Sequence, residues 1–235
     1  MNGFEGYTGI EVAGRQLTDD VIFALLSTLF IAFGIVFRAN YHLFLKMVRD
    51  IFQVKDRQSL FESVSGNESA FRAFMIFQFL LLCSVYIYIM GQTYGYIPGY
   101  PTIKGNLAAI GIILALTFGF YVLKQLMYNA CGYIFAASGL YKAWYSGYSA
   151  SAGLFGAAMY IPVISAAYTS VDSRMTLYAA VALYAMWRMI IAYRTIIVFN
   201  IRGVGFLYII LYLCAQEILP LVLIYEGVIY LYNLY

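Results

Sequence analysis

Long apolar stretches separated by short polar segments dominate the chain. They cover residues 21–37, 73–90, 107–123, 150–167, 175–196 and 205–225. A helix of about 20 residues is needed to cross the ~30 Å hydrocarbon core of a bilayer. The pattern therefore predicts an all-α fold, a polytopic transmembrane helical bundle with about six spans.

The segment Gln125 to Tyr148 leaves the number of spans open. Lys124 and Lys142 mark it as semi-polar, yet it is too hydrophobic for a free loop. We expect a helical continuation or a re-entrant piece here, and a seventh span is the main alternative.

Residues 38–72 form the only sizeable hydrophilic segment. Apolar residues recur in it at helical spacing: Tyr41, Phe44, Leu45, Val48 and Phe52. Lys46, Arg49 and Asp50 fall on other faces. This pattern predicts an amphipathic helix on the membrane surface, with Lys46 and Arg49 toward anionic headgroups. The alternative is a plain extension of the first span.

The same segment contains Asn67-Glu68-Ser69, which matches a glycosylation sequon. We set this motif aside because the segment is predicted to be cytoplasmic.

Composition supports the membrane assignment and removes several classes of function. Hydrophobic residues make up 63% of the chain and charged residues 11%, and the mean hydropathy is +0.80. Soluble domains have about 45–50% apolar and about 25% charged residues, so this chain requires lipid.

A net charge of +3 gives no reason to expect a nucleic-acid partner. Three cysteines without paired spacing and a single histidine, His42, predict no metal site and no cofactor.

Basic residues predict the orientation. With the N-terminus outside, the inner segments collect eleven basic residues: Arg38, Lys46, Arg49, Lys55, Arg57, Arg72, Lys124, Lys142, Arg188, Arg194 and Arg202. The outer segments hold Arg15, Lys104 and Arg174. We therefore expect an outward (periplasmic) tail at 1–17, a single transmembrane domain at 18–235 with a cytoplasmic segment at 38–72, and an outward C-terminus. Residues 1–17 lack a basic stretch of the kind that begins a removable signal peptide.

Small residues spaced four apart predict close helix packing. One ladder contains Gly111, Ala115 and Gly119, and another contains Ser149, Gly153 and Ala157; a parallel row pairs Ala152 with Gly156. Pro162 is expected to kink the fourth span. The connector at 92–101, rich in Gly, Pro and Tyr, is expected to form an ordered turn.

The fifth and sixth stretches contain the candidate buried polar site, formed by Glu217, Gln216 and Pro220 of the sixth stretch and Arg188 of the fifth. A carboxylate within a span costs about 2–3 kcal/mol or more unless it is partnered. At 1.5 Å per residue, Glu217 lies about 14 Å and Arg188 about 20 Å from the outer ends of neighbouring spans. We expect an Arg188–Glu217 pair that acts either as a lock between helices or as a proton or cation relay. Gln216 is expected to bond another helix.

Pro220 lies three residues after Glu217 and cannot donate a hydrogen bond to the Gln216 carbonyl. That carbonyl could serve an ion site, as in broken transporter helices, or the proline could simply kink the helix.

The stretch Leu211-Tyr212-Leu213-Cys214-Ala215-Gln216-Glu217-Ile218-Leu219-Pro220 resembles the C-terminal signature of an uncharacterised family of multispan inner-membrane proteins from Bacteroidota. Gln216 stands where that family more often has Leu. The resemblance implies a bacterial inner membrane and no particular reaction.

Three functions fit these observations. The first is a non-enzymatic scaffold or accessory component in envelope assembly, secretion or transport, which binds other membrane subunits or itself. The second is a small transporter or channel that uses Glu217 and Pro220. The third is an enzyme on lipid-linked substrates, with Asp50, Asp56 and Glu62 as its only nearby acid–base groups. No nucleophile motif, phosphate loop or metalloprotease helix is present, and we favour the first function.

Overall fold

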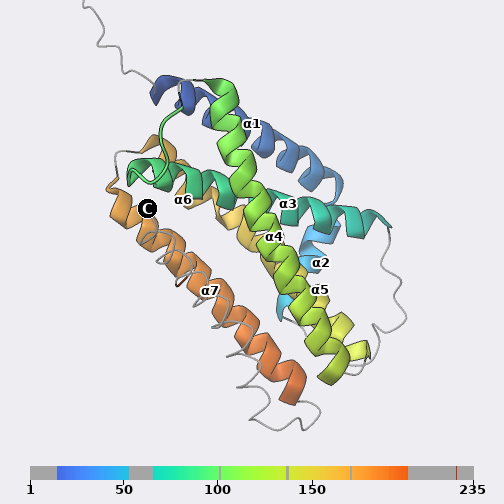
Figure 1. Ribbon diagram of the computed structural model, residues 1–235. Coiled ribbons are helices and arrows are strands. Elements are labelled where there is room, and N and C mark those ends of the chain that lie inside the picture. Colours follow the sequence, from blue (N-terminus) through green and yellow to red (C-terminus); the bar gives the residue numbers. More distant parts are fainter. Residues whose placement is uncertain are drawn as a thin grey trace, which may run out of the picture.

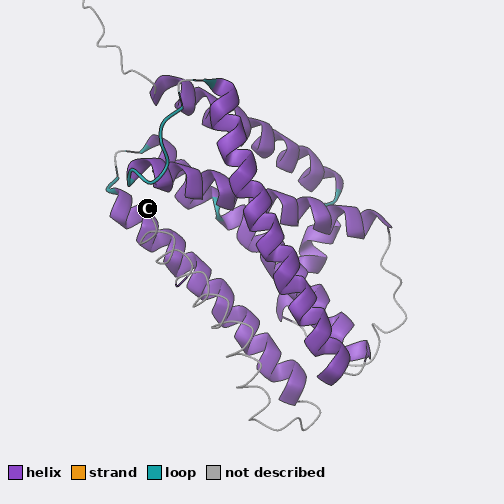
Figure 2. Cartoon of the chain, viewed as in Figure 1, coloured by secondary structure: helices purple, strands orange, loops and turns teal. Residues whose placement is uncertain are grey.

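The computed structural model describes residues 15–52, 66–100, 102–135, 138–169, 171–200 and Glu226. The described chain contains seven helices and no strand (Figures 1 and 2). They are α1 (Arg15–Ala39), α2 (Tyr41–Phe52), α3 (Gly66–Thr93), α4 (Ile103–Phe135), α5 (Ser138–Ala158), α6 (Tyr160–Tyr168) and α7 (Ser173–Asn200).

Five segments are long and apolar enough to cross a membrane, so the chain is a multipass membrane protein. They are Asp19–Ala39, Gly66–Thr93, Ile103–Asn129, Gly147–Tyr168 and Ser173–Ile196. These segments coincide with the first five predicted spans, and the helical bundle is confirmed. The predicted sixth span at 205–225 lies outside the described residues.

The first span and the segment after it form two helices. α1 begins at Arg15 and ends at Ala39, and α2 begins at Tyr41. Between them, the Asn40 side chain donates Nδ2–H to the Val36 carbonyl at 3.1 Å and its Oδ1 accepts from Asn67 at 3.0 Å. These bonds fix the turn, so α2 is a separate amphipathic helix rather than an extension of the first span.

The segment 125–148 continues the helices on either side of it. α4 extends to Phe135, and α5 begins at Ser138. No additional span is found there among the described residues. The helical continuation is therefore what the structure contains.

The connector after α3 is an ordered turn, as expected. Gly95 has a φ of 78°, a left-handed conformation that a side chain would disfavour. The backbone N–H groups of Tyr96 and Ile97 both donate to the Gly91 carbonyl, at 2.8 and 3.0 Å. The turn thereby caps the C-terminal end of α3.

α3 and α5 are the most buried elements, and they run parallel. Arg72 of α3 lies level with Ser149 of α5. Farther along, a Cβ added at Gly153 would come 2.9 Å from Met75 Cβ, and one at Gly156 would come 2.8 Å from Phe79 Cβ. The absence of a side chain at both glycines therefore allows the two helices to approach closely.

The fourth span breaks at Met159, between α5 and α6. Pro162 has no N–H, so it cannot donate to the carbonyl of Ala158, four residues earlier. Met159 nevertheless keeps helical dihedral angles, φ −65° and ψ −15°, and takes part in helical hydrogen bonds with Phe155 and Val163, so the interruption is local. The kink expected from Pro162 stays a prediction.

The outward surface of the bundle is apolar. α4 lies across α3, and α7 lies along one side of the bundle (Figure 1). Large side chains are exposed on both, including Leu116 (68%) of α4 and Met189 (72%) of α7. These faces require lipid or another membrane helix.

Candidate functional site

The candidate site predicted from sequence is only partly within the described residues. Glu217, Gln216 and Pro220 lie outside them. Arg188 lies on α7, half-buried, and donates its Nε–H to the Tyr184 hydroxyl at 2.8 Å. Its guanidinium carbon is 4.7 Å from the centre of the Trp187 ring. The Arg188–Glu217 pair therefore stays a prediction.

The residues predicted to bind the membrane surface or to act as acid–base groups also lie only partly within the described residues. On α2, Arg49 and His42 are exposed, while Lys46 is half-buried. Asp56 and Glu62 lie outside the described residues, and so does the side chain of Asp50.

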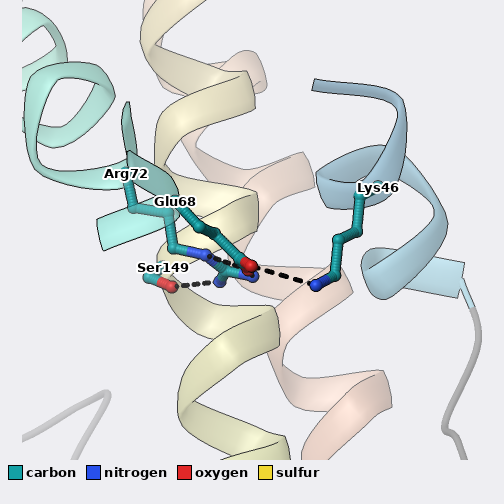
Figure 3. Close-up of polar contacts among 4 residues, drawn as sticks. All are labelled: Lys46, Glu68, Arg72 and Ser149. Carbon is teal, nitrogen blue, oxygen red and sulfur yellow. Dashed lines mark hydrogen bonds and ion pairs between the residues drawn. The ribbon is translucent and has the colours of Figure 1, made fainter. Parts of the chain in front are cut away.

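A polar cluster of four residues joins three helices at the end of the bundle where α2 lies (Figure 3). Lys46 of α2 donates to Glu68 Oε2 at 2.9 Å. Arg72 donates to Glu68 Oε1 through Nε at 3.2 Å and Nη2 at 2.8 Å, and through Nη1 to Ser149 Oγ of α5 at 2.9 Å. We call these residues the Glu68 cluster.

The local sequence explains how Glu68 is positioned. Glu68 lies in the first turn of α3, where the helix dipole favours a negative charge. Arg72 follows four residues later on the same face, and this spacing brings two side chains of one helix together. Glu68 is only 6% exposed, so its charge needs the two cations.

The packing beneath the cluster brings α2 to α3. Leu43 and Met47, on the apolar face of α2, form a buried group with Phe71 and Met75 of α3. Gly153 of α5 completes the contact, because a Cβ there would come 3.0 Å from the Met47 methyl carbon. The ion pairs thus lie above an apolar contact among the same three helices.

The geometry of the Glu68 cluster favours helix fixation over acid–base chemistry. Both carboxylate oxygens of Glu68 accept hydrogen bonds from cations, and the side chain is shielded from solvent. Among the described residues, no group of three His, Cys, Asp or Glu side chains could hold a metal ion. The cluster can therefore fix the amphipathic helix α2 to two spans.

A family model for a domain of unknown function, DUF4271, matches residues 22–228. The match covers most of the chain, including the Glu68 cluster and the stretch that contains Glu217. The chain belongs to the DUF4271 family. No curated protein and no solved structure matches it.

This DUF4271 chain also has a basic and aromatic region on the other side of α5. Lys124 of α4 lies 5.6 Å from the Tyr128 ring centre, and Tyr128 lies 5.2 Å from the ring of Tyr148. Arg194 of α7 is 5% exposed and lies directly over Gly147, where a Cβ would overlap its guanidinium group. Lys124 and Arg188 thus lie against rings of the linked aromatic group Tyr128, Tyr148 and Trp187. Arg194 lies over Gly147, the neighbour of Tyr148.

Sequence reasoning missed Glu68 and Arg72 as site residues. It considered Glu68 only as the middle residue of a sequon. The available signal was an acidic and a basic residue four apart at the start of a span. Their partners Lys46 and Ser149 are separated from them by 22 and 77 residues, so no local pattern reveals these contacts.

The small-residue ladders have different surroundings. On α5, Ser149 and Gly153 are buried, and Ala157 is half-buried. On α4, the ladder residues Gly111, Ala115 and Gly119 are all exposed. A Cβ at Gly111 or Gly119 would meet no atom within 4 Å in the part of the chain that the structure describes.

Proposed function

We propose that this DUF4271 protein is a non-enzymatic scaffold or accessory subunit in envelope assembly, secretion or transport. The proposed location is the inner membrane of a bacterium of the Bacteroidota, as the C-terminal resemblance implies. Both termini face outward and α2 lies on the cytoplasmic side, in line with the positions of the basic residues.

The outward-facing ladder of α4 is the observation that carries this proposal. Small residues spaced four apart allow another helix backbone to approach closely in a membrane. On α5, Gly153 and Gly156 serve this purpose against side chains of the same chain. Among the described residues, no atom lies within 4 Å of a Cβ added at Gly111 or Gly119 of the α4 ladder. We therefore assign it to a helix of another subunit or of a second copy.

The polar contacts within the bundle also support a scaffold function. In the Glu68 cluster, charged side chains connect α2, α3 and α5 to one another. A scaffold needs such internal fixation because its outer faces must be held in fixed relative positions.

The double substitution Gly111→Leu with Gly119→Leu tests the proposal. Leucine side chains would extend into the space in front of the ladder, where the described part of the chain has no atom within 4 Å of an added Cβ, so the fold is expected to persist. We expect the fraction of protein in higher assemblies to fall about ten-fold, which corresponds to about 1.4 kcal/mol. Cross-linking in native membranes followed by mass spectrometry measures that fraction.

Gly34→Leu is the matched control. Gly34 lies in the span formed by α1 and also has no atom within 4 Å of an added Cβ, so this change should leave assembly unaltered. An unchanged assembly in the double variant would contradict the proposal, as would a solitary protein with measurable solute flux.

We also propose the Arg188–Glu217 pair as a second lock. The position of Arg188 within the span formed by α7 supports it, because a carboxylate on a neighbouring span would balance the charge of the cation in addition to the contact with the Tyr184 hydroxyl. The lock version predicts that Glu217→Gln lowers thermal stability yet preserves cellular activity. It also predicts that the exchange Arg188→Glu with Glu217→Arg restores stability.

A small transporter or channel that uses Glu217 and Pro220 is the alternative. It predicts a pH- or cation-dependent flux in liposomes that Glu217→Gln abolishes.

A further inference from the structure

The short helix α2 has a second, exposed face, opposite to the one that Leu43 and Met47 pack against the bundle. Four exposed residues form it: Tyr41, His42, Leu45 and Arg49. Residues four apart lie above one another on a helix, so Tyr41, Leu45 and Arg49 form one row and His42 lies beside it. We call these four residues the outer face of α2.

α2 lies at the ends of two membrane spans. The span Asp19–Ala39 ends directly before α2, and Gly66–Thr93 is the next span along the chain. Asn40, in the turn between α1 and α2, accepts a hydrogen bond from the Asn67 side chain in the first turn of α3 at 3.0 Å. The end of one span and the start of the next are therefore side by side, which places α2 at a surface of the bilayer.

The outer face combines apolar and cationic side chains. Tyr41 is 53% and Leu45 is 45% exposed, and Arg49 is exposed one turn beyond Leu45. A second exposed arginine, Arg38, lies near the end of α1, where the ring of Phe37 is 5.6 Å from the ring of Tyr41. Exposed apolar residues together with arginines are typical of a helix at the boundary between lipid headgroups and acyl chains.

The structure also shows which cations of this region are directed outward. Lys46, expected from the sequence to face headgroups, instead donates to Glu68 Oε2 at 2.9 Å, so its charge is directed toward the bundle (Figure 3). Arg38 and Arg49 remain exposed. The sequence contains no carboxylate between residues 38 and 49, so the exposed surface of this stretch is positively charged.

We propose that the outer face of α2, together with Arg38, binds the headgroups of anionic lipids. Tyr41 and Leu45 enter the upper part of the acyl chains, and the guanidinium groups of Arg38 and Arg49 bind lipid phosphates, which match their planar geometry. The His42 ring can donate a further hydrogen bond to a phosphate. This lipid contact is independent of any assembly made by the α4 ladder.

A tryptophan introduced at the outer face can report which lipid lies beside it. The substitution Leu45→Trp places an indole at an exposed position, and bromine atoms on lipid chains quench its fluorescence. The protein is reconstituted in vesicles that contain phosphatidylglycerol and phosphatidylcholine, with either lipid brominated. The signal of the chain's two natural tryptophans is subtracted by using the protein without the substitution.

We expect phosphatidylglycerol to associate with this position at least five-fold more strongly than phosphatidylcholine, because each arginine near an anionic surface strengthens binding about five-fold (about 1 kcal/mol). Adding Arg38→Gln and Arg49→Gln should bring the ratio of the two association constants close to one. The vesicles have the same lipids in both leaflets, so the result does not depend on the orientation of the protein.

Lys104→Gln with Arg174→Gln is the matched control, because these two cations are also exposed but belong to the starts of α4 and α7. This pair removes the same charge and should leave the preference at position 45 unchanged. Equal quenching by the two brominated lipids before any arginine is replaced would overturn the proposal. Absence of quenching by both would also overturn it, since the outer face would then lie in water or against protein.

Discussion

Replacing Glu68 by glutamine is expected to lower the free energy of unfolding by about 3–5 kcal/mol. The substitution keeps the size of the side chain but removes its negative charge. Lys46 and Arg72 then lose the carboxylate that both contact, at 2.9 and 2.8 Å; the Arg72 side chain is only 12% exposed, so its charge is left largely buried without a carboxylate. Equilibrium unfolding in mixed micelles measures this loss.

Asp20→Asn is the matched control for this charge change. Asp20 is exposed on α1, so neutralising it should change the stability by less than about 0.5 kcal/mol. A Glu68→Gln protein as stable as the Asp20→Asn protein would show that the cluster does not hold the helices together.

The substitution Gly156→Leu is expected to destabilise the bundle by about 3 kcal/mol, near the upper end of the usual cost of overpacking. A Cβ at Gly156 would lie 3.1 Å from the Cα and 3.3 Å from the backbone nitrogen of Phe79. These are backbone atoms, so the clash cannot be relieved by a side-chain rotation, and α3 and α5 must separate. The midpoint of thermal unfolding in detergent measures the effect.

Gly34→Leu again provides the comparison, because it places the same side chain in a span with open space around it. If both leucine variants melt at the same temperature, close packing between α3 and α5 does not contribute to stability.

The spans could be predicted from the sequence because they depend on local properties. A run of about 20 apolar residues specifies a membrane helix wherever it occurs. Likewise, Pro162 removes one backbone hydrogen bond from the fourth span because it has no N–H. The amphipathic character of α2 was also predicted, since its apolar residues recur at helical spacing, but the same spacing fits a continuous extension of the first span and so left the turn at Asn40 open.

The polar sites were harder to predict because burial of a polar residue depends on distant segments. Glu217 attracted attention because its depth in a span can be counted along the chain. Glu68 lies at the edge of a span, where a carboxylate usually remains in water. Its burial depends on α2 and α5, which fold against it from distant parts of the sequence.

A double-mutant cycle between Lys46 and Glu68 tests most directly whether the Glu68 cluster fixes α2 to the bundle. The variants are Lys46→Met, Glu68→Gln and their combination, each compared with the wild type by equilibrium unfolding. We predict a coupling energy of about 0.5–1 kcal/mol, as expected for two residues in contact when the lysine of the ion pair is one-third exposed. Additive effects of the two substitutions would contradict the account, because they would show that α2 is held without this contact.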